Sequence, residues 1–262
     1  MSRPPARAVV VCSALLLTAS LTVAACSTYG SRPAPAAASA SPGAGRSSAG
    51  ASPAPAGAPA LTAAQAQAAL ITAGDLGEPW TPTQGAATWR DGLLKASADK
   101  PECGRLLDAV YTEELFGPDA RIRAVAGLDD DWYQAQLHYQ VVAQTPAEVD
   151  RTLAWLRTLP RTCAEFRAKA AGGRVQSGTV QEVTLPNVGD ARQALRITLG
   201  SETPDGDYTE LTLYVAAVRV GDDTIAVTNG GVNEVYESAT RAAVEIGAAR
   251  VAEVRKQGRK QV

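Results

Sequence analysis

Side chains able to do acid–base chemistry at neutral pH are scarce in this sequence of 262 residues. There is one histidine, His138, and Gln136 and Gln140 share its side of an alternating stretch. A histidine acts as a general base only beside a nucleophile or an orienting carboxylate. The sequence contains no Gly-x-Ser-x-Gly, P-loop or His-Glu-x-x-His motif. We therefore expect His138 on a hydrated sheet face or cleft wall, with a hydrolase as the alternative if such a partner lies within hydrogen-bond reach.

Two further stretches, 191–199 and 208–220, alternate polar and apolar residues as strands do. If these strands adjoin the strand of His138, their polar sides would present amides, guanidinium groups and phenols together. Such a surface suits a polar ligand, for example a glycan or an anionic cell-wall fragment. The alternative is an ordinary solvated face of a half-covered sheet. The expected ligand-binding residues are His138, Gln136, Arg192, Arg196, Tyr208 and Tyr214.

Acidic runs at 129–131 and 205–207 raise the question of a calcium site. Both runs lack the ladder of ligands and the closing glutamate of an EF-hand loop. Turn chemistry explains them, because aspartate and glycine favour tight turns. We expect no metal and no other cofactor.

The N-terminus predicts export and lipid attachment. Arg3 and Arg7 precede an apolar run at 8–23, which is too short for a membrane-spanning helix but fits a signal peptide. The run ends Val-Ala-Ala-Cys at Cys26 and resembles the bacterial lipobox, in which the cysteine thiol takes a diacylglycerol and its amine becomes the new N-terminus. Two acyl chains anchor stably where one is marginal. The alternative is an ordinary secretory signal with an incidental Cys26.

Three regions follow from these patterns: a lipoprotein signal peptide at 1–25, a tether at 26–60 and a folded domain at 61–262. In 27–60, 30 of 34 residues are Ala, Ser, Gly or Pro, so we expect a disordered chain with no packed structure. Its root-mean-square span would be roughly 30 Å. The formal net charge of −2 argues against a nucleic-acid partner. We expect lipid anchoring at the extracytoplasmic side of the cell membrane.

The domain at 61–262 is predicted to be α+β. Capping residues predict helices from Thr62 and from Thr145, and apolar spacing predicts a third at 101–114. Pro160 is expected to start a further turn that carries Phe166. Strands are predicted at 132–142, 174–184, 191–199, 208–220 and 224–229, followed by a long helix at 233–256. Because their connections are short, we expect an antiparallel twisted sheet of about five to six strands, with helices packed on one face and a long C-terminal helix.

Two cysteines remain in the mature domain, Cys103 and Cys163. In an exported protein such a pair most simply forms a disulfide. Closing a loop of about 60 residues would stabilise the fold by roughly 4 kcal/mol in the chain-entropy model. Two free thiols are the alternative.

Spaced landmarks across 61–257 resemble a known family. The segment 70–80 reads Leu-Ile-Thr-Ala-Gly-Asp-Leu-Gly-Glu-Pro-Trp, and Cys103 and Cys163 follow at matching places. The chain is similar to actinobacterial sensor-domain lipoproteins and to the extracellular sensor domain of PknH-type receptor Ser/Thr kinases. The resemblance implies an antiparallel sheet flanked by helices, a cleft for an unidentified ligand, and no catalysis by the domain.

We therefore expect a lipid-anchored, extracytoplasmic, non-enzymatic domain that senses or binds a small-molecule or cell-envelope ligand. Two alternatives stay open. A carrier of lipid or another apolar ligand would need a cavity lined by aliphatic side chains. An exported hydrolase would need a carboxylate or hydroxyl beside His138.

Overall fold

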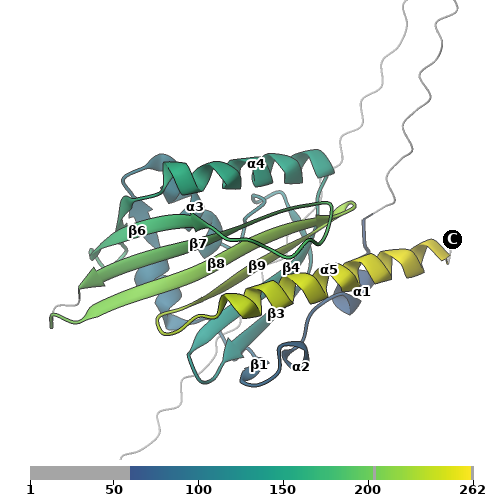
Figure 1. Ribbon diagram of the computed structural model, residues 1–262, viewed down its shortest axis with the longest axis horizontal. Coiled ribbons are helices and arrows are strands. Elements are labelled where there is room, and N and C mark those ends of the chain that lie inside the picture. Colours follow the sequence, from purple (N-terminus) through teal and green to yellow (C-terminus); the bar gives the residue numbers. More distant parts are fainter. Residues whose placement is uncertain (1–59, 203–204, 261–262) are drawn as a thin grey trace, which may run out of the picture. The chain divides into compact units, whose positions relative to one another are not determined.

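An antiparallel sheet organises the domain (Figure 1). The computed structural model describes residues 60–202 and 205–260, so Cys26, the signal peptide and the tether lie outside the described residues. Within the described residues the sheet has nine strands in the order β1-β3-β4-β9-β8-β7-β6-β5-β2, not five or six. The strands are β1 (Trp80–Pro82), β2 (Ala96–Ala98), β3 (Arg121–Asp130), β4 (Ala135–Ala143), β5 (Phe166–Ala170), β6 (Val175–Glu182), β7 (Ala191–Glu202), β8 (Tyr208–Val220) and β9 (Asp223–Gly231).

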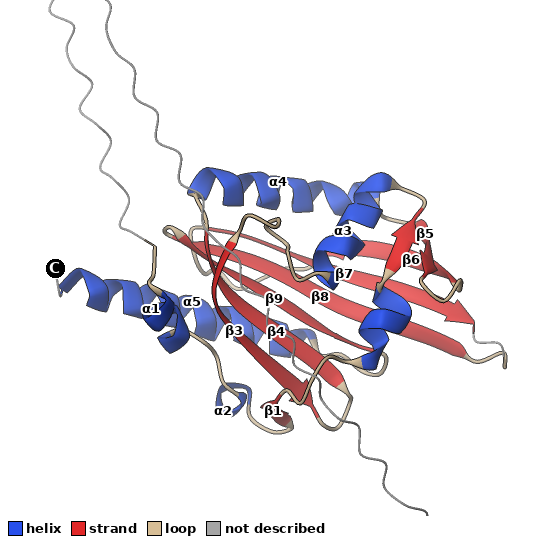
Figure 2. Ribbon diagram, turned by 180° about the vertical axis from the view of Figure 1, so that it is seen from behind, coloured by secondary structure: helices blue, strands red, loops and turns tan. Residues whose placement is uncertain are grey.

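Helices cover both faces of this sheet (Figures 1 and 2). One face packs against α3 (Pro101–Tyr111), α4 (Pro146–Thr162) and the short π-helix η1 (Arg90–Leu94). The other packs against α1 (Ala63–Ala68), α2 (Ala73–Leu76) and α5 (Glu237–Lys260). The expectation of helices on one face was therefore wrong. Of the helices in the described residues, none is long and apolar enough to cross a membrane.

Two predicted helix starts are confirmed by reciprocal capping hydrogen bonds. Thr62 N donates to Gln65 Oε1 at 2.9 Å, and Gln65 N donates back to Thr62 Oγ1 at 3.3 Å. Thr145 and Glu148 form the same box at the start of α4. Each pair satisfies amide groups that have no partner inside the helix. The strands β6 to β9 also follow the prediction, each antiparallel to the one before it in sequence.

Three local predictions were wrong. Helix α4 continues through Pro160 to Thr162 instead of restarting there. The segment that begins at Phe166 is the strand β5, paired with β2 and β6, and not a helical turn. The strand predicted at 132–142 begins only at Ala135, because residues 131–134 form the turn from β3. β4 is also buried on both sides, since helices cover both of its faces.

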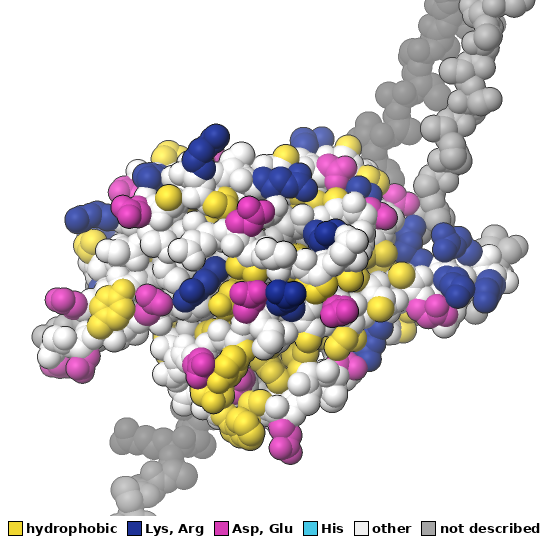
Figure 3. All heavy atoms as spheres, in the orientation of Figure 1, with side chains coloured by type: hydrophobic (Ala, Val, Ile, Leu, Met, Phe, Trp, Pro, Cys, Tyr) yellow, Lys and Arg dark blue, Asp and Glu magenta, His cyan; other side chains and the backbone are white. Residues whose placement is uncertain are grey.

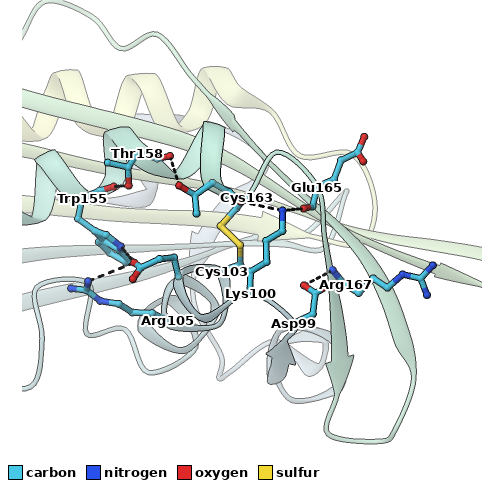
Figure 4. The surroundings of a disulfide bond; sticks show 11 residues. Asp99, Lys100, Cys103, Arg105, Trp155, Thr158, Cys163, Glu165 and Arg167 are labelled. Carbon is cyan, nitrogen blue, oxygen red and sulfur yellow. Dashed lines mark hydrogen bonds and ion pairs between the residues drawn. A yellow bond between two sulfur atoms is a disulfide. The ribbon is translucent and has the colours of Figure 1, made fainter.

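The predicted disulfide joins Cys103 to Cys163 (Figure 4). Both cysteines are fully buried, so the bond fixes the start of α3 to the end of α4 inside the core. Lys100 strengthens the same junction, because its Nζ donates to the carbonyl of Glu165 at 2.6 Å and of Thr162 at 3.3 Å. Covalent and polar links therefore hold α3 and α4 together on one face of the sheet.

On the opposite face, α5 rests directly on a buried ring. The Tyr139 side chain of β4 is fully buried, and its hydroxyl lies 3.5 Å from the carbonyl of Ala69. Burial raises the pKa of this phenol. Gly247 of α5 lies against the ring, and a Cβ there would come within 2.6 Å of ring carbon Cε2 and closer still to the hydroxyl. The helix approaches the sheet this closely only because residue 247 has no side chain.

Gly247→Ala should therefore destabilise the protein by about 1–3 kcal/mol through overpacking, although alanine has the better helix propensity. Gly258→Ala, in the same helix, is the matched control. Its Cβ would meet only the end of the Gln65 side chain, at 2.8 Å from Nε2. This side chain can shift at the cost of, at most, its capping bond to Thr62, so the effect should stay within about 1 kcal/mol. Urea unfolding followed by circular dichroism measures both. Equal stabilities of the two variants would contradict the packing assigned to Gly247.

Candidate functional site

His138 lies in a polar cluster between β4 and the segment that follows α3. Its Nδ1 is 3.3 Å from Glu113 Oε1, a long contact, and the same oxygen is 2.9 Å from Arg90 Nη2. On the other side of the ring, Nε2 is 3.2 Å from Gln136 Oε1. Arg90 is buried, and its guanidinium also donates to the carbonyl of Tyr111 at 2.8 Å. Both ring nitrogens of the histidine therefore face oxygen atoms of fixed side chains.

Gln136 is itself held in place by the backbone around it. Its Nε2 donates to the carbonyl of Gly85 at 2.7 Å and to Asp129 Oδ1 at 2.8 Å, and its Oε1 accepts from Ala87 N at 3.2 Å. This orientation leaves only an acceptor for His138. The ring therefore donates from Nε2 to Gln136, while Nδ1 lies 3.3 Å from the Glu113 carboxylate.

The surroundings of His138 leave no room for a substrate. The adjoining cavity, which Glu113, Gln140 and Thr228 also line, has a volume of about 10 Å³, roughly the space of one water molecule. A carboxylate does lie within reach of the histidine, as the hydrolase alternative required. Because Nε2 is bonded to Gln136, Nδ1 faces the Glu113 carboxylate and the adjoining cavity holds about one water molecule, the geometry favours a structural cluster.

Glu113 carries the electrostatic consequence of this cluster. Hydrogen bonding from His138, together with the positive charges of His138 and Arg90, lowers the pKa of the Glu113 carboxyl against the opposing effect of burial. The residue also adopts a positive φ of 61°, which is uncommon for a side chain other than glycine. The backbone at the end of α3 is thus shaped to turn this carboxylate toward Arg90 and His138.

The single polar face expected from the sequence is not formed. β9 and β8 separate β4 from β7, and Gln136 and His138 point to the α3 side of the sheet. The other four residues follow the alternation of Ala194 and Ala216, which face α5: Arg192, Arg196, Tyr208 and Tyr214. Of these, Tyr208 is 65% exposed and Tyr214 only 7%. Ligand binding by the residues on the α5 side stays a prediction.

Two carboxylates of the acidic run at 129–131 accept hydrogen bonds from backbone N–H groups, as expected for residues at a turn. Asp129 Oδ2 accepts from Gln84 N at 2.9 Å. Asp130 Oδ1 accepts from Trp132 N at 3.0 Å and from Tyr133 N at 2.9 Å, which closes the turn between β3 and β4. Among the described residues, no group of three or more His, Cys, Asp or Glu side chains is placed to hold a metal ion.

A groove of about 460 Å³ lies at the end of the sheet where α5 begins. This volume is within the range of small-molecule sites. Four aromatic residues line it: Trp80 from β1, Trp132 and Tyr133 from the β3–β4 turn, and Tyr236 just before α5. Trp132 is 67% exposed and Tyr236 is 40% exposed. We call this feature the aromatic groove.

Hydrogen bonds to the backbone hold the aromatic groove in shape. The turn closed by Asp130 presents Trp132 and Tyr133 side by side in the chain, and Asn233 Nδ2 donates to the carbonyl of Tyr133 at 3.1 Å. The rings of Tyr133 and Tyr236 meet edge to face, with centroids 5.2 Å apart and an interplanar angle of 82°. This is a favourable geometry for an aromatic pair.

The ionisable residues that line the aromatic groove are acidic: Asp75, Glu78 and Asp130. Asp75 is paired from behind by Arg250, whose guanidinium donates to both carboxylate oxygens at 2.6 and 2.8 Å. Figure 3 shows hydrophobic and acidic side chains gathered in the lower part of the view, over the end of the sheet at β3. The groove therefore combines aromatic surface with negative charge.

The sequence did not point to this groove because its residues come from three distant segments. Trp80 entered only as part of the family landmark, and Trp132, Tyr133 and Tyr236 were not singled out. The usable signal was Trp132-Tyr133 directly after an aspartate-rich turn, since a large aromatic side chain at a turn has little core to enter. Only the fold brings Tyr236 beside them.

Comparisons with known proteins add little. No protein-family model matches the sequence, and no curated protein matches it. Among solved structures, the extracellular domain of PknH from Mycobacterium tuberculosis is similar, with 15% sequence identity, a TM-score of 0.42, and coverage of 77% of this chain and 100% of that domain. It belongs to the family that the sequence landmarks resemble.

The lowered pKa of Glu113 predicts how the stability of the protein depends on pH. The carboxylate of Glu113 adds to the free energy of unfolding above the ordinary carboxyl pKa of 4.5. This contribution is lost as the pH falls through the lower pKa of the folded state. Glu113→Gln should lower the free energy of unfolding by about 2 kcal/mol near pH 6, and the difference from the wild type should shrink toward pH 3. Urea unfolding at a series of pH values measures this.

The matched control is Glu114→Gln, which changes the exposed neighbouring carboxylate. Its stability curve should run parallel to that of the wild type. A Glu113→Gln curve that also ran parallel to the wild type would show that Glu113 gains nothing from His138 and Arg90.

Proposed function

We propose that the protein is a lipid-anchored, extracytoplasmic binding domain whose ligand occupies the aromatic groove. The anchor is the lipidated Cys26, and the tether at 26–60 holds the domain away from the membrane. The ligand is a small molecule of the cell envelope or its surroundings, and the domain recognises it without chemical change. The observation that carries this proposal is the aromatic groove itself, with its exposed Trp132 and acidic rim.

A binding role fits the separate positions of the histidine and of the exposed aromatic side chains in the domain. The histidine, which is the side chain best suited to proton transfer at neutral pH, is bonded to Gln136 at Nε2 and faces the Glu113 carboxylate at Nδ1. The exposed aromatic surface lies elsewhere, at the end of the sheet. Solvent-exposed aromatic side chains that gather in a groove typically mark a place where a ligand or partner is bound.

The position of the groove also suits a tethered domain. The chain enters the domain at Leu61, whose N–H donates to Asp223 Oδ1 at 2.9 Å. Asp223 is paired with Arg255, near the end of α5. The groove is lined by Ser238 and Ala239 at the beginning of the same helix. About 25 Å of helix therefore separates the groove from Arg255, near which the chain enters the domain. A domain tethered at its entry point would present the groove away from that point.

Lipid anchoring makes the first prediction from this proposal. The N-terminal peptide of the mature protein should begin at Cys26 and carry the mass of a diacylglycerol, and Cys26→Ala should lose this mass and leave the membrane fraction. Cys12→Ala is the control and should change neither, because Cys12 lies in the removed signal peptide. Mass spectrometry with membrane fractionation measures both. An unmodified Cys26 in the mature chain would refute the anchor.

Ligand binding makes the second prediction. Native mass spectrometry of the full mature chain, released in a polyoxyethylene detergent, should find a small molecule bound to the wild type. Trp132→Ala should retain at least about tenfold less, because it removes the most exposed ring of the groove. Since Trp132 is 67% exposed, the variant should fold normally.

Tyr208→Ala is the matched control, because Tyr208 is a similarly exposed aromatic residue at 65% outside the groove. It should retain the ligand at the wild-type level. Loss of the ligand in Tyr208→Ala but not in Trp132→Ala would overturn the assignment to the aromatic groove, and the residues of the α5 side predicted from the sequence would take its place.

A further inference from the structure

The charge of the aromatic groove selects among possible ligands. Of the described residues that line it, none is lysine or arginine, and three are acids: Asp75, Glu78 and Asp130. Arg250 offsets the charge of Asp75, and Asp130 is buried and bonded to the backbone of the turn. The exposed negative charge of the lining therefore comes from Glu78. Glu234 adds another carboxylate beside Tyr236. An anionic ligand would meet like charges here, whereas a cation would meet complementary ones.

The aromatic rings favour the same class of ligand. The faces of Trp and Tyr rings carry negative charge density and attract cations, with Trp the strongest. Hydrogen bonding with Tyr133 and with Glu234 raises the pKa of Tyr236, so this phenol carries no negative charge at neutral pH. The exposed part of the groove is therefore aromatic surface edged by carboxylates.

The domain already contains one example of this contact. The guanidinium carbon of Arg105 lies 4.0 Å from the centroid of the Trp155 ring, and Trp155 Nε1 donates to Glu102 Oε2 at 2.6 Å (Figure 4). There the cation comes from the protein itself. In the aromatic groove, Trp132 and the carboxylate of Glu78 line the same space, and none of the cation–π contacts of the described residues involves Trp132.

We propose that the aromatic groove binds a small organic cation with an alkylammonium group, which lies against Trp132 and is neutralised by the exposed carboxylate of Glu78. This inference rests on the proposed binding function and names the class of its ligand. The volume of about 460 Å³ admits an ammonium group together with a short polar chain. The carboxylates supply the attraction, and the rings replace the water that the alkyl groups lose.

Choline and its uncharged isostere 3,3-dimethylbutan-1-ol test this inference. The full chain in a polyoxyethylene detergent, with its four tryptophan indoles labelled with nitrogen-15, gives signals that single Trp→Phe variants assign. Choline should shift the Trp132 indole signal and bind at least about tenfold more tightly than the isostere. Sodium chloride at matched ionic strength is the blank and should shift nothing.

Three variants locate the interaction. Trp132→Ala should weaken choline binding about tenfold, as measured by calorimetry, and Glu78→Gln should weaken it about threefold while leaving the isostere unchanged. Trp155→Ala is the control and should bind choline as the wild type does. Higher salt should weaken binding, because the carboxylates lie near the surface.

Equal binding of choline and its isostere, or choline binding that Trp132→Ala leaves unchanged, would overturn the cation class. The proposed function would survive that result if native mass spectrometry still found an uncharged molecule, such as a saccharide, that Trp132→Ala releases. Absence of any retained molecule together with absence of choline binding would overturn both.

Discussion

The constraint on which the rest of the domain depends is the burial of both faces of its central strands. β4, β8 and β9 lie in the middle of the nine-stranded sheet formed by the described residues, with α3 and α4 on one side and α5 on the other. A polar side chain in the covered part of these strands has little access to bulk water, so it depends on partners inside the protein. Gln136 and His138 therefore bond to neighbouring protein groups, whereas aromatic side chains such as Trp132 are exposed to solvent at the end of the sheet.

The cluster around His138 follows from this constraint. Arg90 is a buried cation, and a buried cation is tolerated only with a charged or hydrogen-bonded partner. Glu113 supplies the charge, and Arg90 also donates to the carbonyl of Tyr111. His138 and Gln136 continue the network to the loop at 83–87. The histidine ring thus lies between Glu113, just after α3, and Gln136, which bonds to this loop.

The sequence was sufficient for local structure and insufficient for burial on both faces. The capping boxes at Thr62 and Thr145 and the disulfide between Cys103 and Cys163 were predictable, because each depends on a few side chains at fixed spacing. The alternation around His138 was also recognised, yet a polar side of a strand looks the same in sequence whether water or another polar residue satisfies it. The strand β5 was not predicted because Pro160 suggested a new turn, whereas α4 tolerates this proline in its last turn. The aromatic groove needs the fold, since Trp80, Trp132 and Tyr236 are far apart in the chain.

Internal hydrogen bonds of the kind that surround His138 also fix the backbone around the aromatic groove. Asp130 fixes the turn that carries Trp132, Asn233 holds the carbonyl of Tyr133, and Asn229 Nδ2 donates to the carbonyl of Tyr236 at 3.2 Å. A ligand would therefore order few protein groups on binding, which lowers the entropic cost of the complex. Affinity in such a groove depends on what lies at its surface, and here that is aromatic faces and carboxylates. The same internal hydrogen bonds that fix Gln136 and Arg90 under the helices therefore have counterparts at the end of the sheet, where they hold the backbone and leave the aromatic rings exposed.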